Sequence, residues 1–151
     1  MKTLNSPLRA EDSVAIANRL RPVLLHVNRH LRRELHILGV SSGQVSILAA
    51  IRDRPGIGVA ELAAAEGTAV PSMSVHIDRL EAGGLVTRRR EEAADRRRVG
   101  LTLTPGGTRV LRTVRSRRTA WLAERLAALS ADEREVIARA IGPLAALVNR
   151  S

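Results

Sequence analysis

The spacing of apolar residues changes twice along this chain, and these changes limit the folds that it can adopt. Up to residue 84, apolar side chains recur every three or four residues, which is the period of an amphipathic helix. Residues 85–103 instead alternate apolar and polar side chains, as strands do, around a charged stretch at 90–98. The helical period returns from residue 105. The pattern predicts a mainly α-helical chain with one small β-hairpin.

Residues that start and stop helices divide the first part of the chain. A stripe of apolar residues at 11–38 predicts one long helix, in which Pro22 can introduce a kink. Ser41 or Ser42 can cap the next helix, which ends at residues 54–56. Two short helices around a tight glycine turn follow, and this arrangement suggests a helix-turn-helix. They are expected at about residues 59–65 and 71–82, with Gly67 in the turn.

The helices after the hairpin complete the predicted architecture. A third long helix runs to about residue 129, and Ser130 with Glu133 forms a capping box for a last helix, which Pro143 should bend or weaken. The order of elements predicts one compact domain built on a winged helix-turn-helix. Its predicted parts are an N-terminal arm and dimerisation helix at 1–38, the winged module at 39–104 and C-terminal dimerisation helices at 105–151.

The terminal helices predict a homodimer. Long amphipathic helices at both ends carry more apolar surface than one small winged core can cover. This surface should be buried against a second copy of the chain, and we expect a two-fold dimer.

Composition excludes several kinds of protein. The chain has no cysteine, so it lacks disulfides, a thiolate nucleophile, a zinc finger and a cysteine redox switch. Phe and Tyr are absent and Trp121 stands alone, which argues against binders that stack single-stranded bases on aromatic side chains. No apolar run reaches the about 18 residues of a membrane span, and no secretory signal is visible. We expect a cytoplasmic, soluble protein with an aliphatic core and no membrane contact.

The basic charge favours a nucleic-acid partner. Of the 25 basic residues 24 are arginine, and the formal net charge is +10. Guanidinium groups bind phosphates and base edges through paired hydrogen bonds, although a GC-rich coding sequence would also raise the arginine content. Residues 1–54 and 105–151 each carry +5, whereas residues 55–104 are neutral. Six arginines of that neutral segment crowd the hairpin, which makes the wing the expected electrostatic contact: Arg88, Arg89, Arg90, Arg96, Arg97 and Arg98.

The helix expected at 71–82 has one face for the core and another for a partner. Met73, Ile77 and Leu80 share a face and should point to the core. If the helix enters a major groove, the other side chains of its N-terminal half meet base edges. The predicted contacts are Ser72 and Ser74 as short donors, Val75 on a thymine methyl, His76 at a purine acceptor, and Arg79 at a phosphate or a neighbouring carboxylate.

Short motifs are concentrated between residues 59 and 107. They are Pro71-Ser72-Met73-Ser74, Asp78-Arg79-Leu80-Glu81, Gly84-Leu85-Val86, Asp95-Arg96-Arg97 and Leu101-Thr102-Leu103-Thr104-Pro105-Gly106. Together these motifs resemble the MarR family of dimeric winged-helix regulators, and the order of helices extends the resemblance over most of the chain. The resemblance implies a homodimer that binds a pseudo-palindromic operator in double-stranded DNA, usually to repress transcription, and that a small ligand releases.

The resemblance also implies roles within the wing. Asp95 should brace Arg97 so that Arg97 enters a minor groove, where narrow A·T-rich DNA attracts it, while Arg96 and Arg98 meet phosphates. Many family members have Thr-Arg where this chain has Ser74-Val75, so the usual recognition arginine is missing. Operator sequences therefore cannot be transferred from relatives. The predicted wing contacts are Arg88, Arg90, Asp95, Arg96, Arg97 and Arg98.

Polar side chains inside the helical stripes suggest either structural ion pairs or an effector site. Arg118 and Arg125 fall within the apolar face of the helix at 105–129, and buried guanidinium groups need partners. In one interpretation they form structural salt bridges with Glu34, either within one chain or between the two chains of a dimer. A second makes either arginine the anchor of a small anionic or aromatic effector, and in a third Arg125 stacks on Trp121. The predicted effector site comprises Asn28, His30, Arg118, Trp121 and Arg125.

No pattern indicates catalysis, a metal or a cofactor. His26 and His30 have the spacing of zinc ligands on a helix, but no cysteine or nearby carboxylate completes a set. The glycine pairs at 83–84 and 106–107 belong to a turn and a helix start, not to a phosphate-binding loop. We expect a transcriptional regulator rather than an enzyme. Two alternatives keep the same fold: a nonspecific architectural DNA-binding protein and a winged-helix module that binds proteins.

Overall fold

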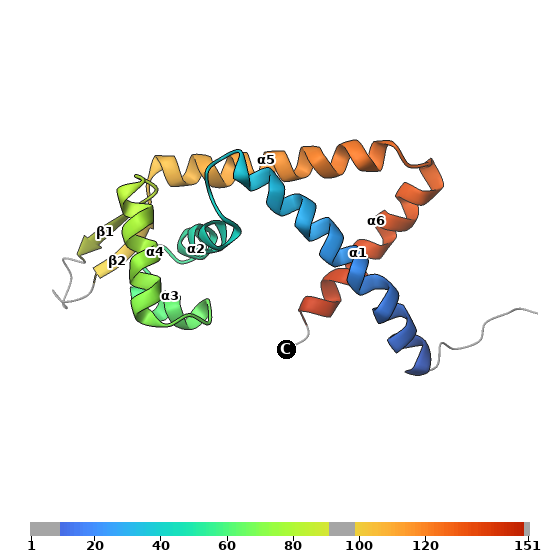
Figure 1. Ribbon diagram of the computed structural model, residues 1–151, viewed down its shortest axis with the longest axis horizontal. Helices are drawn as coiled ribbons and strands as arrows, with labels where there is room; N and C mark the ends of the chain where they lie inside the picture. The colour runs from blue at the N-terminus through green and yellow to red at the C-terminus, as the bar shows by residue number, and fades with distance from the viewer. Residues whose placement is uncertain (1–9, 91–98, 150–151) are drawn as a thin grey trace, which may run out of the picture. The chain divides into compact units, whose positions relative to one another are not determined.

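The computed structural model describes residues 10–90 and 99–149 and consists of helices and one hairpin (Figure 1). The contacts divide the chain into two compact units, Met1–Leu111 and Arg112–Ser151, which are described in turn. The elements are α1 (Ala10–His36), α2 (Ser42–Asp53), α3 (Val59–Ala65), α4 (Val70–Ala82), β1 (Val86–Arg90), β2 (Val99–Leu103), α5 (Pro105–Ala127) and α6 (Ala131–Val148). The mainly α-helical fold with a small β-hairpin wing is confirmed.

Local chemistry explains where the helices of the first unit begin. Ser41 is the N-cap of α2: its Oγ accepts from the Gln44 amide at 3.1 Å, and Gln44 Oε1 accepts from the Ser41 amide at 2.9 Å. This capping box satisfies two amides that the helix cannot pair internally. Of the two serines that the sequence offered, Ser41 therefore caps and Ser42 opens the helix. Pro22 lies inside α1, which continues past it.

The core of the winged module is aliphatic, as its composition requires. Met73, Ile77 and Leu80 of α4 are buried, which confirms the predicted inward face. They are joined in the core by buried residues of the other elements: Leu48 and Ile51 of α2, Leu62 of α3, Val86 of β1 and Leu101 of β2. The close contacts between α3 and α4, α4 and β1, and α2 and β2 hold these elements as one module.

The predicted hairpin is confirmed as an antiparallel pair of strands. Val86 lies opposite Leu103 and Arg90 opposite Val99. The segment after α2 also joins this sheet, because the Gly56 amide donates to Leu101 O at 2.8 Å and the Leu101 amide donates to Ile57 O at 2.9 Å. The hairpin is thereby fixed to the helical part of the module. The connection at 91–98 lies outside the described residues.

The second unit contains most of α5 and all of α6. Ser130 caps α6 in the predicted capping box with Glu133, and the amide of Ser130 lowers the pKa of the Glu133 carboxyl by hydrogen bonding to it. The Arg134 guanidinium donates to Leu129 O at 2.5 Å, between the two helices. Pro143 lies inside α6, and no residue of this helix is buried. Its apolar side chains Val136 and Ile141 are 57% and 63% exposed.

Candidate nucleic-acid interface

The helix-turn-helix consists of α3 and α4. The turn between them includes Gly67, whose φ of +63° is a conformation that glycine adopts without steric cost. The Thr68 amide donates to Ala63 O at 2.9 Å and closes the turn. The predicted turn is therefore present, and α4 begins at Val70, one residue before Pro71. The first turn of α4 tolerates Pro71 because amides there have no partner within the helix.

The outward face of α4 carries short side chains. Ser72 is exposed, Ser74 and His76 are half-buried, and Val75 is 47% exposed. These residues alternate around the helix with the buried Met73 and Ile77, so the core fixes which side of α4 faces outward. Short side chains allow the backbone of a helix to come close to a flat partner such as the edges of base pairs. Their role as base contacts stays a prediction.

Arg79 lies exposed on the same helix. From its sequence position, the predicted partner of Arg79 is either a phosphate or a neighbouring carboxylate. Among the described residues no carboxylate pairs with Arg79, and the neighbouring Asp78 and Glu81 are instead paired with another arginine. This arrangement favours the phosphate alternative.

Arg88 is the arginine that occupies those carboxylates. Its Nη2 donates to Asp78 Oδ1 at 2.6 Å and its Nη1 to Glu81 Oε2 at 2.5 Å. The hydrogen bond to Asp78 is the main cause that raises the pKa of Arg88, with the charge of Glu81 adding to it. From the sequence, Arg88 is among the predicted wing contacts to DNA; the structure places it in two ion pairs within the module. Its partners are on α4, the preceding helix, which a charge count along the hairpin cannot reveal.

The remaining wing residues fall into two groups. Arg89 and Arg90 are exposed near the end of β1 and available to a partner surface. The other predicted wing contacts lie outside the described residues: Asp95, Arg96, Arg97 and Arg98.

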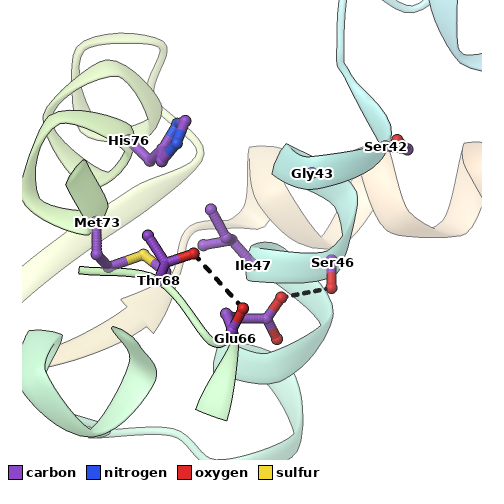
Figure 2. A pocket seen from close by; sticks show the side chains of 8 residues that line it. All are labelled: Ser42, Gly43, Ser46, Ile47, Glu66, Thr68, Met73 and His76. Atoms are coloured by element: carbon purple, nitrogen blue, oxygen red, sulfur yellow. Dashed lines mark hydrogen bonds between the residues drawn. The ribbon is translucent and has the colours of Figure 1, made fainter. Parts of the chain in front are cut away.

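A pocket of about 380 Å³ borders the outward face of α4 (Figure 2). Its residues come from α2, from the turn before α4 and from α4 itself, where His76 lies at its edge. Ser46 Oγ donates to Glu66 Oε2 at 2.7 Å, and Thr68 Oγ1 donates to Glu66 O at 3.5 Å. This cluster could not be predicted from the sequence, since Ser46 and Glu66 are 20 residues apart and belong to no motif. The cluster links α2 to the turn that orients α4.

Comparisons with known proteins identify the family. The model of the MarR family matches residues 40–99, which include α2, the helix-turn-helix and β1. An uncharacterised HTH-type transcriptional regulator of Mycobacterium bovis is 30% identical over 141 residues, covering 93% of this chain and 98% of the relative. The chain belongs to the MarR family. It is therefore a DNA-binding transcriptional regulator with a winged helix-turn-helix.

Solved structures of MarR-like regulators have the same fold. A transcriptional regulator of Pseudomonas aeruginosa superposes with a TM-score of 0.81 at 28% identity, over 95% of this chain and all of that one. A Staphylococcus aureus MepR variant, solved bound to an oligodeoxyribonucleotide, superposes with a TM-score of 0.71 at 19% identity, over 89% of this chain and 98% of that one. At that identity the second likeness concerns the fold alone.

The predicted effector residues of this MarR-family chain lie on two helices. On α1, Asn28 and His30 are two residues apart and therefore point to opposite sides of the apolar stripe. Asn28 borders a basic hollow on α1 that also includes Arg29 and Arg32. The His30 ring meets the His26 ring, with their Nε2 atoms 3.2 Å apart. Within the described residues, no group of three His, Asp or Glu side chains is arranged to hold a metal.

On α5, Arg118 and Arg125 differ in the partners of their guanidinium groups. The guanidinium of Arg125 lies 4.0 Å from the ring centroid of Trp121, and its Nη1 donates to Trp121 O and to Glu124, each at 3.2 Å. The stacking interpretation of Arg125 is confirmed. Arg118, by contrast, has a buried Nε that finds no hydrogen-bond partner among the described residues. Roles of either arginine in effector binding stay predictions.

None of the helices that the structure describes is long and apolar enough to span a bilayer.

Proposed function

We propose that this MarR-family protein is a repressor that binds a pseudo-palindromic operator as a homodimer, with α4 of each copy in a major groove. The observation that carries the proposal is the outward row of short side chains on α4, in one module with the exposed arginines of β1. Ser72, Ser74 and His76 can donate or accept at base edges, and Val75 can contact a thymine methyl. The MepR variant that shares this fold was solved with an oligodeoxyribonucleotide, which supports the same use of the module here.

The wing completes the proposed interface. Arg90 would meet the phosphate backbone, which attracts guanidinium groups whatever the sequence. Arg97, braced by Asp95, would enter the minor groove beside the site, with Arg96 and Arg98 at phosphates. In this division of roles, α4 reads the sequence and the wing adds affinity.

Exposed apolar residues support the proposed homodimer. On α6, Leu147 and Val148 are 65% and 83% exposed, and on α1 Val14 and Val23 are 64% and 56% exposed. Apolar surface of this extent is normally covered by a partner. A second copy would cover it on residues 1–38 and 105–151 and leave residues 39–104 to bind DNA. Two-fold symmetry would then set the two α4 helices roughly 34 Å apart, the repeat of the major groove.

A competition experiment tests the proposed function. Duplexes that bind the protein are first selected from a random library. The affinity of the protein for a selected duplex is then compared with its affinity for a scrambled duplex, both at about 150 mM salt, which is close to the physiological ionic strength. A specific regulator should prefer the selected duplex by about 1,000-fold or more. Equal binding to both duplexes would instead indicate an architectural DNA-binding protein. Failure to bind either would indicate a protein-interaction module.

We also propose that an anionic effector regulates DNA binding through Arg118. The support is the buried Nε of this residue, which has no hydrogen-bond partner in the described part of the chain. A buried donor without an acceptor costs about 1–3 kcal/mol. A carboxylate ligand would supply the acceptor and a compensating charge.

A panel of phenolic and lipophilic acids tests this regulation. At least one acid should weaken operator binding and raise the Tm of the wild type by a few degrees, as a ligand that binds the folded state does. Both effects should disappear in Arg118→Gln and persist in Arg115→Gln, which removes an exposed arginine from the same helix. Operator affinity that stays constant across the whole panel contradicts the proposed regulation.

A further inference from the structure

The strand β1 places Arg88 on the face that packs against α4. Side chains alternate along a strand, so Arg88 shares a face with Val86, which is only 2% exposed. The contact between α4 and β1 puts the guanidinium against the helix, and the Arg88 side chain is 31% exposed. The neighbouring Arg89 lies on the opposite face and is exposed. Adjacent arginines of one strand thus have different surroundings.

The guanidinium of Arg88 forms ion pairs with two carboxylates. Asp78 and Glu81 are three residues apart and lie on the same side of α4, where Arg88 reaches both with separate nitrogens. Among the described residues, no other cation pairs with either of them. Without Arg88, two uncompensated negative charges would therefore lie on the helix that the proposed function puts in the major groove. Negative charge there would repel the phosphates of DNA.

We infer that Arg88 is a positioning residue for DNA binding: through its ion pairs to Asp78 and Glu81 it holds the wing strand against α4 and offsets one of their two negative charges, rather than contacting DNA itself. This inference rests on the proposed DNA-binding surface. A lysine could not do the same, because one ammonium cannot span two carboxylates as the guanidinium fork does.

A double-mutant cycle on a selected duplex separates this role from a phosphate contact. Arg88→Gln should weaken binding by about 10-fold to 100-fold, because it leaves both carboxylates unpaired and frees the wing strand. Adding Asp78→Asn and Glu81→Gln to that variant should recover part of the affinity, because it removes the two unpaired charges although the wing strand is still not held. In the wild-type background the same two substitutions should bring a smaller gain, because they also break the two ion pairs that hold the wing strand against α4.

The inference is overturned if the effects of the substitutions on DNA affinity are additive. If removing the two carboxylates raises the affinity by the same factor with and without Arg88, the three residues are not coupled in DNA binding. Arg89→Gln is the matched control, because it removes an equal charge from the next position of β1. Its loss should not be recovered by removing the carboxylates. A lost phosphate contact would instead reduce the slope of log K against log salt concentration by about 0.9 in magnitude. That change in Arg88→Gln, with no recovery of affinity in the triple variant, would assign Arg88 to a phosphate.

Unfolding by urea without DNA tests the ion pairs independently of the proposed function. Arg88→Gln should lower the midpoint, and the triple variant should restore part of that loss. Arg88→Lys, a milder change, serves for the same cycle if Arg88→Gln does not fold. A protein that prefers no duplex but shows this coupling refutes the proposed function and not the ion-pair arrangement. An unchanged midpoint in both arginine variants refutes the arrangement itself.

Discussion

Gly107→Ala should destabilise the winged module by roughly 3 kcal/mol, the upper end of what overpacking costs. A Cβ at this buried position would lie 2.2 Å from Leu85 O and 3.2 Å from Leu85 C, which are backbone atoms that cannot move aside alone. Alanine otherwise favours a helix over glycine by about 1 kcal/mol, so helix propensity alone predicts the opposite sign. The measurement is the free energy of unfolding in urea.

Gly43→Ala is the control for this prediction. Gly43 lies in a helix of the same unit, and its Cβ would meet only Ser41 Oγ, at an ordinary 3.8 Å. We expect a change within about 1 kcal/mol of the wild type, in the direction that propensity favours. If Gly107→Ala and Gly43→Ala unfold at the same urea concentration, the close approach of α5 to the start of the hairpin is wrong.

Val75→Glu should reduce the affinity for a selected duplex by about 100-fold or more, because like charges brought together across an interface cost several kcal/mol. Val75 is 47% exposed on α4, so the substitution leaves the core intact and should change the stability by less than about 0.5 kcal/mol. Fluorescence anisotropy with a labelled duplex measures the loss.

Ala82→Glu provides the matched control for Val75→Glu. It adds the same charge to the same helix, at the exposed residue where α4 ends. Because the N-terminal half of α4 is the proposed reading surface, this variant should lose less than about 5-fold in affinity, which corresponds to about 1 kcal/mol. Equal losses in both variants would mean that the two substitutions act through net charge, and that Val75 does not face the bases.

Local rules were sufficient to predict the elements of this fold from the sequence. The capping box at Ser130 depends on residues three positions apart, and the inward face of α4 depends on the helical period. At the start of α2 the sequence indicated a serine cap but left the choice between Ser41 and Ser42 open. The stacking of Arg125 on Trp121 likewise joins residues one helical turn apart. Interactions between residues three or four positions apart can be predicted from the spacing of residues along the sequence, and the structure confirms the ones predicted here.

Interactions between elements were harder to predict. The assignment of Arg88 to DNA counted its charge but not its partners, which are seven and ten residues away on another helix. A signal was present nonetheless, since the strand alternation puts Arg88 on the same face as the buried Val86. The hydrogen bond between Ser46 and Glu66 had no such signal, because it depends on how α2 packs beside the turn before α4.

The stoichiometry of the complex on a selected duplex tests the central claim most directly. Light scattering coupled to size-exclusion chromatography would give the mass of the protein alone and with a duplex that carries two half-sites about 10 base pairs apart. The account predicts two chains in solution and two chains on each duplex, unchanged when flanking DNA is lengthened. One chain per duplex, or a number of chains that grows with duplex length, would contradict it.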